Sequence, residues 1–555
     1  MGEQDLVGRP ETIVDVLSAR ASSEELAYVF LADGTPESEQ RWSFADVAEQ
    51  SNAVAAQLRG RQIGIGDRVL LALNPSLQYI AALYAIMKVG AIPVPCFPPW
   101  RPRELDRFGA IARDCLPTAV VIDSMYRDRI EELQGRFADN GFDPVIIYSA
   151  DDVDDAAETR QARRRATDLA LIQYTSGSTG SPKGVCLTHD NLMSNCEALA
   201  RSMGDDPERI GLSWLPPYHD MGLLGTIVLS MYHGWPLVLM SPMHFVQQPR
   251  RWLEAITHYR VSITVGPNFS LELCTDALLD GDPGDLDLST VRQLYCGAEP
   301  ISADTLQRFD RHLAPLGFDG SALIPCYGLA EATLFVAGRR RGSGYRTRGA
   351  PETAGRTVVS CGAVDAEHTV RIVDPMTRRP VGDGSVGEVW VSGRSVAAGY
   401  YNRPELSDNV FHARVPGDQN DYLRTGDLGF MASDELFVTG RIKDLIVVNG
   451  RNIYPQDVEA TVLRADPGVR KAVAFAVLGD GTEQLCVIAE PTNQRDSYSA
   501  MVEAITTSLT AEFGIAAAVH ICAKRAIPTT TSGKVRRHEA RRMFLANELR
   551  SECTA

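Results

Sequence analysis

The sequence lacks the features that mark several broad classes of protein. Its 11 cysteines are scattered and form no CxxC pair, which excludes a disulfide framework and a cysteine-based zinc site. No apolar run is long enough to span a bilayer, because the most apolar segments, at 70–94 and 227–240, are broken by polar residues and proline. The first ten residues have no apolar core, so they do not form a secretory signal. We therefore expect a protein of the reducing cytoplasm.

Positive charge is also scarce. Lys and Arg number 55 against 71 Asp and Glu, so the formal net charge of the 555 residues is −16. An acidic surface repels phosphate backbones, which argues against nucleic acid and anionic membranes as partners. The hydrophobic fraction of 44% and the charged fraction of 23% are those of an ordinary folded protein. The length predicts about three to five core-sized units.

The first half of the chain alternates strand and helix patterns. A β-rich run at 67–73, an amphipathic segment at 75–88 and a second apolar run at 91–96 predict a βαβ unit with parallel strands. An earlier helix is predicted over 44–59, with Ser43 as its N-cap. Further strands are predicted at 119–123, 144–149, 169–174, 261–265 and 294–296.

The second half has a different pattern. After about residue 360 short strands with glycine turns, at 369–373, 387–392 and 435–438, predict a β-rich subdomain. From 441 onward an α+β pattern runs to the last residue. Two segments are predicted to be exposed: a charged connection at 151–165 and a Gly- and Arg-rich loop at 339–356. The predicted fold class is thus α/β, with parallel βαβ subdomains, a β-rich subdomain and a small α+β domain.

The most informative segment is YTSGSTGSPKGV, residues 174–185. It follows an apolar strand and combines glycines, which let backbone N–H groups approach oxyanions, with hydroxyls and one lysine. A hydroxyl-rich surface turn would explain a shorter string, but this one predicts a phosphate-binding loop. It is not a Walker A loop, because the GxxxxGK[ST] spacing is absent. The residues expected to hold phosphate are Thr175, Ser176, Gly177, Ser178, Thr179, Gly180 and Lys183.

This string resembles the signature loop of the adenylate-forming enzymes, the superfamily of acyl-CoA synthetases, nonribosomal adenylation domains and luciferases. The resemblance runs from about Trp42 to Arg542, with further motifs in the expected order. It implies ATP and Mg2+ as cofactors. It also implies a large N-terminal domain over 1–440, which binds ATP and the acyl group, and a small mobile C-terminal domain over 441–555 with the catalytic lysine.

Two motifs of the N-terminal part carry implied nucleotide contacts. In CYGLAEATLFV, residues 326–336, the resemblance implies that Tyr327 and Gly328 bind the purine and that Glu331 holds Mg2+. Taken alone, Glu331 would equally be a carboxylate at the start of a helix. In CGAEP, residues 296–300, the resemblance implies that the backbone flanks adenine. The residues concerned are Gly297, Ala298 and Glu299.

Three residues near the domain boundary take roles from the resemblance. Asp427, in the glycine turn of YLRTGDLG, is expected to accept hydrogen bonds from the ribose hydroxyls, although a plain turn aspartate is the alternative. Arg441 is expected near the ribose and phosphate. Lys443 occupies the family's hinge position, about which the small domain rotates between the two half-reactions.

Lys534, in IPTTTSGKVRR, matches the catalytic lysine of the superfamily. The chemical need is plain, because a carboxylate must attack an anionic α-phosphate, and two unit charges at 4 Å repel by about 4 kcal/mol at an effective dielectric near 20. One ammonium with Mg2+ offsets this repulsion. His219, in LPPYHDMGLLG, is implied to position the acyl carboxylate rather than to act as a general base. A packed core histidine is the alternative for His219.

Three strings resemble fatty acyl-AMP ligases in particular: residues 240–260, 266–274 and 450–459. An apolar acyl tunnel is expected nearby, although its candidate residues would equally form core. The segment between CYGLAEATLFV and Ser360, about 337–359, looks shorter than in that subfamily, where an insertion is associated with rejecting CoA. The tunnel candidates are Leu223, Leu224, Ile227, Met231, Phe269 and Leu271.

The predicted function is therefore ATP-dependent conversion of a fatty acid to acyl-AMP, with release of pyrophosphate and transfer of the acyl group to the phosphopantetheine thiol of an acyl carrier protein. This would serve lipid or polyketide biosynthesis. Seven basic residues between 524 and 542 are a weak indication of an acidic carrier docking in trans, with a solvated helix face as the alternative. The alternatives for the whole chain are an acyl-CoA synthetase and a catalytically silent acyl- or nucleotide-binding protein.

Overall fold

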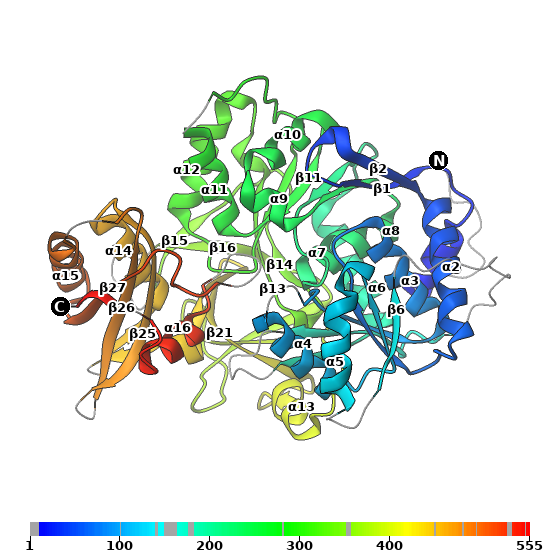
Figure 1. The fold of residues 1–555 in the computed structure, drawn as a ribbon. Helices are drawn as coiled ribbons and strands as arrows, with labels where there is room; N and C mark the ends of the chain where they lie inside the picture. Colours follow the sequence, from blue (N-terminus) through cyan, green and yellow to red (C-terminus); the bar gives the residue numbers. More distant parts are fainter. Residues whose placement is uncertain are drawn as a thin grey trace. The chain divides into compact units, whose positions relative to one another are not determined.

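The computed structural model divides the chain into two compact units (Figure 1). The larger unit runs to Ser385 and adds Val389–Thr425 and Met431–Phe437, and the smaller unit starts at Val438 and adds two short pieces of the preceding strands. The predicted α/β class is confirmed. The structure describes residues 10–99, 102–138, 143–148, 164–175, 182–279, 282–350, 357–448, 451–479, 482–494, 497–529, 535–549 and 551–554.

The predicted βαβ unit is present in the larger unit. Helix α3 (Leu77–Val89) begins at the N-cap Ser76 and ends at Gly90, which takes the left-handed backbone with φ 101°. It connects parallel strands of a four-stranded sheet in the order β4-β3-β5-β6. These strands are β3 (Arg68–Ala72), β4 (Ile92–Pro95), β5 (Ala119–Ile122) and β6 (Val145–Tyr148), with helices α4 (Pro102–Cys115) and α5 (Arg127–Ala138).

The early helix is also confirmed. Helix α2 (Phe44–Gly60) starts at Ser43, whose hydroxyl accepts the Asp46 N–H at 3.1 Å while the Asp46 carboxylate accepts the Ser43 N–H at 2.7 Å. This reciprocal pair satisfies two backbone donors that the first turn would otherwise leave open.

A second, larger sheet forms the centre of the same unit. Its middle strands are parallel, and the chain alternates between them and the helices α10 (Arg250–Tyr259), α11 (Asn268–Leu279) and α12 (Ala303–Leu313), which Figure 1 shows gathered beside β11. The parallel strands are, in spatial order, β13 (Leu323–Gly328), β12 (Gln293–Cys296), β11 (Ile263–Gly266), β9 (Gly211–Ser213), β10 (Leu237–Met240) and β1 (Leu26–Leu31).

The short strands expected after residue 360 extend this sheet rather than forming one of their own. They follow β13 through β14 (Phe335–Gly338), which pairs antiparallel with both of its neighbours. The strands concerned are β16 (Thr357–Val364), β22 (Glu435–Arg441), β21 (Asp421–Ala432), β18 (Gly387–Gly393) and β17 (His368–Val373).

The prediction of an exposed loop over 339–356 is partly wrong. Thr347–Gly349 forms strand β15, which pairs antiparallel with β16. Arg339 is buried because its guanidinium pairs with Glu435 and donates to the Gly344 carbonyl at 3.0 Å. The composition of the segment does not indicate these contacts, since an arginine is normally exposed unless it is paired. Residues 351–356 of this segment, and 151–163 of the charged connection, lie outside the described residues.

The third sheet of the larger unit is small and carries the phosphate-loop motif. Strands β7 (Leu169–Thr175) and β8 (Lys183–Thr188) pair antiparallel, and β19 (Gly399–Tyr400) adds to the free side of β8. Ile172, Tyr174 and Cys186 pack into the apolar core of the β4-β3-β5-β6 sheet. The base of the phosphate hairpin is thereby fixed to a rigid layer.

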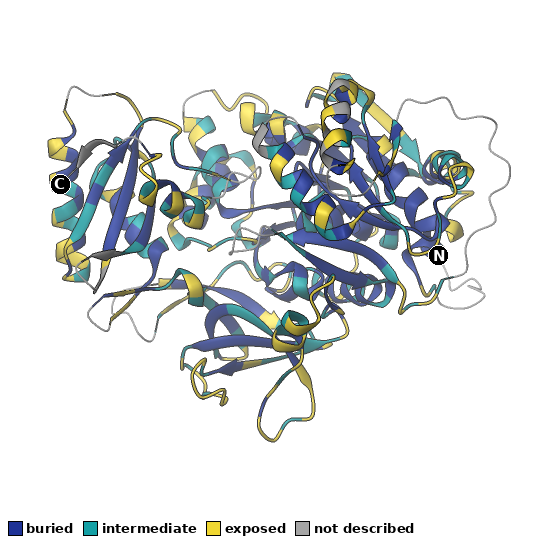
Figure 2. Cartoon of the chain, turned by 60° about the horizontal axis from the view of Figure 1, so that its bottom comes forward, coloured by how far each residue is buried: buried dark blue, intermediate teal, exposed yellow. Residues whose placement is uncertain are grey.

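The smaller unit packs helices on both faces of a four-stranded sheet. Along β26 (Thr482–Pro491), Val487 and Ala489 face one core, whereas Cys486 and Ile488 face the other, as the two-residue period of a strand requires. The middle strands of this sheet are drawn as largely buried in Figure 2. The other elements are β25 (Val469–Gly479), β27 (Ala517–Cys522), β28 (Ser551–Thr554), α14 (Pro455–Ala465), α15 (Ser499–Phe513) and α16 (Arg537–Leu545).

Candidate active site

Four sequence motifs meet at one edge of the large sheet. Strands β9, β11, β12 and β13 run parallel, with Gly266 beside Cys296 and Cys296 beside Pro325, so their carboxyl ends lie together. In open α/β sheets ligands bind outside such ends. The segments that follow these strands carry His219, Phe269, Gly297–Glu299 and Glu331. The larger unit thus gathers residues that are far apart in the sequence.

The turn that carries Glu331 is tightly held. Thr333 is buried and adopts φ 67° and ψ −62°, the strained centre of a γ-turn in which the Leu334 N–H donates to the Ala332 carbonyl at 2.8 Å. The Thr333 hydroxyl donates to the Ser395 carbonyl at 2.6 Å, and the Glu331 carbonyl accepts the Ala397 N–H at 2.9 Å. Strain of this kind persists only where the surroundings over-determine it. Glu331 is therefore held in place and half-buried.

The segments expected around the purine also lie at this edge. Ala298 is exposed and takes φ 67°, and the adjacent Glu299 carboxylate accepts the Phe269 N–H at 2.7 Å. The Glu299 side chain thus ties two motif loops together. Tyr327 is buried at the end of β13. A Cβ on Gly328 would lie 1.7 Å from the Leu334 carbonyl oxygen, so only glycine fits there.

The ends of the phosphate hairpin are described, and its tip is not. Thr175 and Lys183 face each other as ladder partners of β7 and β8. The preceding Tyr174 donates its hydroxyl to Asp114 at 2.6 Å, which anchors the strand to α4. The predicted phosphate ligands Ser176, Gly177, Ser178, Thr179 and Gly180 lie outside the described residues.

A residue that the sequence analysis missed connects Lys183 with Glu331. The Tyr400 hydroxyl donates to Glu331 Oε1 at 2.8 Å, and Lys183 Nζ lies 5.2 Å from the centre of the Tyr400 ring. That distance is within the range of a cation–π contact. The sequence gives only one signal here, the tyrosine pair Tyr400–Tyr401 between Gly399 and a polar turn. This pair does not indicate which residues Tyr400 contacts.

His219 lies at the start of a helix and is not a core residue. Its side chain is 39% exposed, Nδ1 lies 2.6 Å from Asp220 Oδ1, and the Met221 N–H lies 3.4 Å from Nδ1. The same Asp220 oxygen accepts the Met221 N–H at 2.7 Å. The helix continues as a π-helical turn over Leu223–Val228, a distortion that is frequent at functional sites.

The apolar residues expected along an acyl tunnel are mostly buried. Leu223, Leu224, Ile227, Met231 and Leu271 are all less than 9% exposed, whereas Phe269 is half-buried. The Phe269 ring packs edge-on against Trp214 at 5.9 Å. Burial fits a tunnel and a core equally, so their role stays a prediction.

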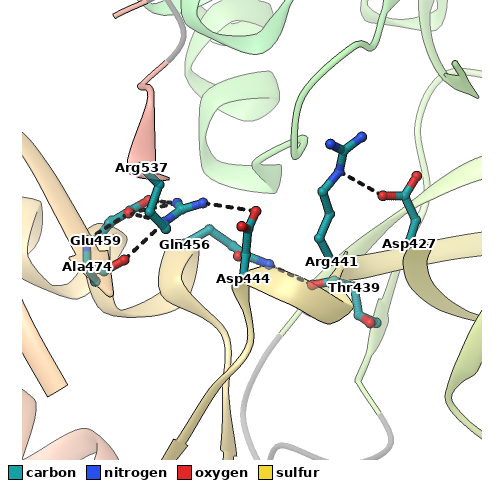
Figure 3. A network of polar contacts seen from close by, with 8 residues as sticks. All are labelled: Asp427, Thr439, Arg441, Asp444, Gln456, Glu459, Ala474 and Arg537. Atoms are coloured by element: carbon teal, nitrogen blue, oxygen red, sulfur yellow. Dashed lines mark hydrogen bonds and ion pairs between the residues drawn. The ribbon is translucent and has the colours of Figure 1, made fainter. Parts of the chain in front are cut away.

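In the smaller unit Asp427 and Arg441 form an ion pair (Figure 3). Arg441 Nε lies 2.8 Å from Asp427 Oδ1, and the side chain of Asp427 is 5% exposed whereas that of Arg441 is 50% exposed. Nearby, the Gln456 amide donates to the Thr439 carbonyl at 2.6 Å. Lys443 follows in a short 3-10 turn, Ile442–Asp444.

A second network of the smaller unit lies around Arg537 (Figure 3). Arg537 Nη2 contacts the two carboxylate oxygens of Glu459 at 2.7 and 2.9 Å, and Nε donates to the Ala474 carbonyl at 3.0 Å. Arg537 Nη1 reaches Asp444 at 3.5 Å. Burial raises the pKa of Glu459; burial acts to lower the pKa of Arg537, but the charge of Glu459 raises it overall. The network joins the turn that contains Lys443 to the first residue of α16.

Lys534 lies in 530–534, outside the described residues. On either side of that segment Thr529 and Val535 form a β-bridge, and the Arg536 N–H donates to the Pro528 carbonyl at 2.8 Å.

The basic segment around 524–542 is less open than the sequence indicates. Arg537 is used internally, and the Arg542 guanidinium pairs with both Glu539 and Glu548 at 3.0 and 2.8 Å. Arg541 donates to the Ala476 carbonyl at 2.8 Å. Lys524, Arg525 and Arg536 are exposed.

Among the described residues no group of three or more His, Cys, Asp or Glu could hold a metal ion by itself. Mg2+ typically binds through one or two carboxylates together with substrate phosphates and water, so the single held carboxylate of Glu331 fits this ion. In the part of the chain that the structure describes, no helix is both long and apolar enough to cross a membrane.

Comparison with family models gives two matches. Residues 17–401 match the model described as AMP-binding enzyme. Residues 443–554 match the model described as the AMP domain of Disco-interacting protein 2-like proteins.

Three individual proteins illustrate the similarity. JamA of Moorena producens (strain JHB), named as a medium-chain-fatty-acid–[acyl-carrier-protein] ligase, is 34% identical over 98% of this chain and 97% of its own length. FadD21 of Mycobacterium tuberculosis (strain ATCC 25618 / H37Rv), whose name places it among fatty-acid–CoA ligases, is 34% identical over 90% and 92%. The crystal structure of a fatty acid AMP ligase from Legionella pneumophila matches with a TM-score of 0.75 and 34% identity, over 99% of this chain and 98% of that one.

Proposed function

The chain belongs to the family of AMP-binding enzymes, and we propose that it is a fatty acyl-AMP ligase that delivers its acyl group to an acyl carrier protein. The resemblance to fatty acyl-AMP ligases noted in the sequence is confirmed by these matches. The observation that carries the proposal is the convergence of the His219, Glu299 and Glu331 loops at the carboxyl edge of parallel strands. The relatives supply the substrate class.

For ATP, we assign the triphosphate to the hairpin from Thr175 to Lys183 and to Glu331. The adenine is assigned to Gly297–Glu299 with Tyr327 and Gly328, and the ribose to Asp427 with Arg441. The Asp427 carboxylate accepts hydrogen bonds only, which suits ribose hydroxyls. When bound at Glu331, Mg2+ supplies positive charge to phosphate oxygens.

In the first half-reaction a carboxylate oxygen of the fatty acid attacks the α-phosphorus. The new P–O bond forms as the bond to the β-phosphate breaks, so acyl-AMP and pyrophosphate result. Lys534 is assigned to the charge that builds on the α-phosphate, and His219 to positioning the carboxylate.

In the second half-reaction the phosphopantetheine sulfur of the carrier attacks the acyl carbonyl. The thioester forms, AMP leaves, and the thiol proton passes to solvent. We assign residues 1–440 to an adenylating domain and 441–555 to a domain that turns about Lys443 between the two steps. All ten cysteines whose side chains the structure describes are free, which favours the cytoplasmic location.

CoA is the alternative acceptor. Two points favour it: the segment 337–359 is shorter than the resemblance to fatty acyl-AMP ligases implies, and FadD21 carries the name of a CoA ligase. For the carrier we assign the exposed basic side chains Lys524, Arg525 and Arg536, which complement an acidic partner.

One assay tests the proposal. The purified protein is given ATP, Mg2+ and a ladder of fatty acids, split between CoA and a holo acyl carrier protein, and analysed by mass spectrometry. We expect acyl-AMP that persists with CoA and disappears with the carrier, and no acyl-AMP from Lys534→Ala. Charge reversal at Lys524 and Arg525 should raise the KM for the carrier and leave acyl-AMP formation unchanged. Rapid acyl-CoA formation would make the protein a synthetase, and no adenylate with any acid would leave a silent binding protein.

A further inference from the structure

Tyr400 contacts the two charged groups that the proposed nucleotide site needs most. Its hydroxyl is 2.8 Å from Glu331 Oε1, and its ring face receives the Lys183 ammonium at 5.2 Å. The side chain is 8% exposed, and Phe411 packs edge-on against the ring at 5.0 Å. The ring therefore has little freedom to leave either partner.

The backbone fixes this arrangement from both sides. In β19, Tyr400 pairs with Val185 and Gly399 with Cys186, so the tyrosine belongs to the strand pair that carries Lys183. The same segment reaches the acidic turn through the Ala397 N–H, which donates to the Glu331 carbonyl at 2.9 Å. Residues 397–401 thus connect the lysine strand to the carboxylate turn.

A neutral connector has a physical advantage here. In a direct Lys183–Glu331 ion pair, the ammonium and the carboxylate would neutralise each other. No such ion pair occurs between these two described residues. The phenol occupies one acceptor site of the carboxylate and leaves the others. The ring face attracts the ammonium without accepting its N–H bonds as a carboxylate would. Both charges are thereby fixed and remain available to a ligand.

We propose that Tyr400 is a positioning residue that presents Glu331 to a divalent cation and Lys183 to the nucleotide phosphates. The inference rests on the proposed nucleotide site. It predicts two separable effects, because the hydroxyl serves the carboxylate and the ring serves the lysine.

The test uses the full chain with Mn2+ as the metal probe and α,β-methylene ATP as a non-reacting nucleotide. Mn2+ binding is followed by electron paramagnetic resonance, and metal-free binding of the analogue by calorimetry. Tyr400→Phe should weaken Mn2+ binding about 10- to 100-fold, as loss of an outer-shell partner does. Metal-free analogue binding should stay within about twofold. Tyr400→Leu should weaken analogue binding by a further factor of about 2 to 30, the range of a cation–π contact.

The matched control is Tyr401→Phe, which removes the hydroxyl of the neighbouring tyrosine and should leave both affinities unchanged. The proposal is overturned if Tyr400→Phe binds Mn2+ as the parent does, or if the control loses as much. Should Tyr400→Leu melt well below the parent, the Phe variant alone decides. These bindings need no fatty acid, so a parent that makes no acyl-AMP yet shows the Tyr400 effects would refute the proposed function and leave this inference standing.

Discussion

Charged side chains are used in opposite ways in the two units. Around Tyr400 an ammonium and a carboxylate are kept apart by a neutral phenol. Around Arg537 the charges meet directly, because the guanidinium contacts the carboxylates of Glu459 and Asp444 and also donates to the Ala474 carbonyl. A bidentate pair satisfies its own charge and serves the fold, whereas a separated pair keeps its charge for a ligand. For these two networks, the contrast predicts a role in stability for the Arg537 pair and a role in ligand binding for Lys183 and Glu331.

The largest expected effect on stability comes from breaking the Arg537 network. Arg537→Met leaves Glu459 buried without its partner, so we expect the smaller unit to lose about 3–5 kcal/mol of stability. Urea unfolding followed by hydrogen exchange in β25 and β26 measures this. The double variant Arg537→Met with Glu459→Met should recover most of the loss, since a buried pair is often replaceable by apolar groups. A double variant as unstable as the single one would show that the pair is not the cause.

The next effect belongs to the separated pair. Glu331→Gln keeps the size of the side chain and removes its charge, so we expect acyl-AMP formation to fall about 10²- to 10³-fold, as for loss of one preorganised charge-stabilising group. The melting temperature should remain within about 2 °C of the parent, because no ion pair is broken. Initial rates and a thermal scan on the same preparation measure both. A large loss of stability with little loss of rate would place Glu331 in the fold and not in the site.

Features that depend on neighbouring residues could be predicted from the sequence, whereas contacts made by tertiary pairing could not. Helix α2, the parallel strands β3 to β5 and the strands of the β-rich region follow from local patterns, because capping and two-residue alternation are local. Tyr400 was missed because its partners, Glu331 and Lys183, are brought together only by tertiary pairing of β19 with β8. Arg339 was misplaced for the same reason, since its partner Glu435 is distant in the sequence. The roles of Lys534 and Asp427 rest on the resemblance and remain predictions.

A third use of an ionisable side chain is to keep it uncharged by burial, as at two histidines. Burial lowers the pKa of His189 and of His233 to about 4 each. Both ring nitrogens of His189 are buried without a hydrogen-bond partner among the described residues. The unfolded chain binds protons from about pH 6.5 downward, so stability should fall as the pH drops from about 6.5 through 4, by on the order of 3 kcal/mol per histidine.

Unfolding free energies measured from pH 7 to pH 4 test this dependence. The variant His189→Gln should have a shallower slope than the parent over that range, because it lacks one of the histidines whose pKa burial lowers. An unchanged slope would assign the acid sensitivity to other residues.

The smallest expected effect tests whether the solvent exposure of an arginine, rather than its ion pair as such, sets its contribution to stability. Arg441 and Arg537 both pair with a carboxylate in the smaller unit, but the side chain of Arg441 is 50% exposed and that of Arg537 is 20% exposed. Because the Arg441 guanidinium is half solvated, Arg441→Gln should cost less stability than Arg537→Gln, but more than the about 0–1 kcal/mol of a fully exposed pair, since it leaves the 5% exposed Asp427 carboxylate without this cation. If Arg441 serves the ribose and phosphate, the KM for ATP should nevertheless rise in Arg441→Gln. Equal costs in stability for the two variants would mean that desolvation is not what sets the two arginines apart.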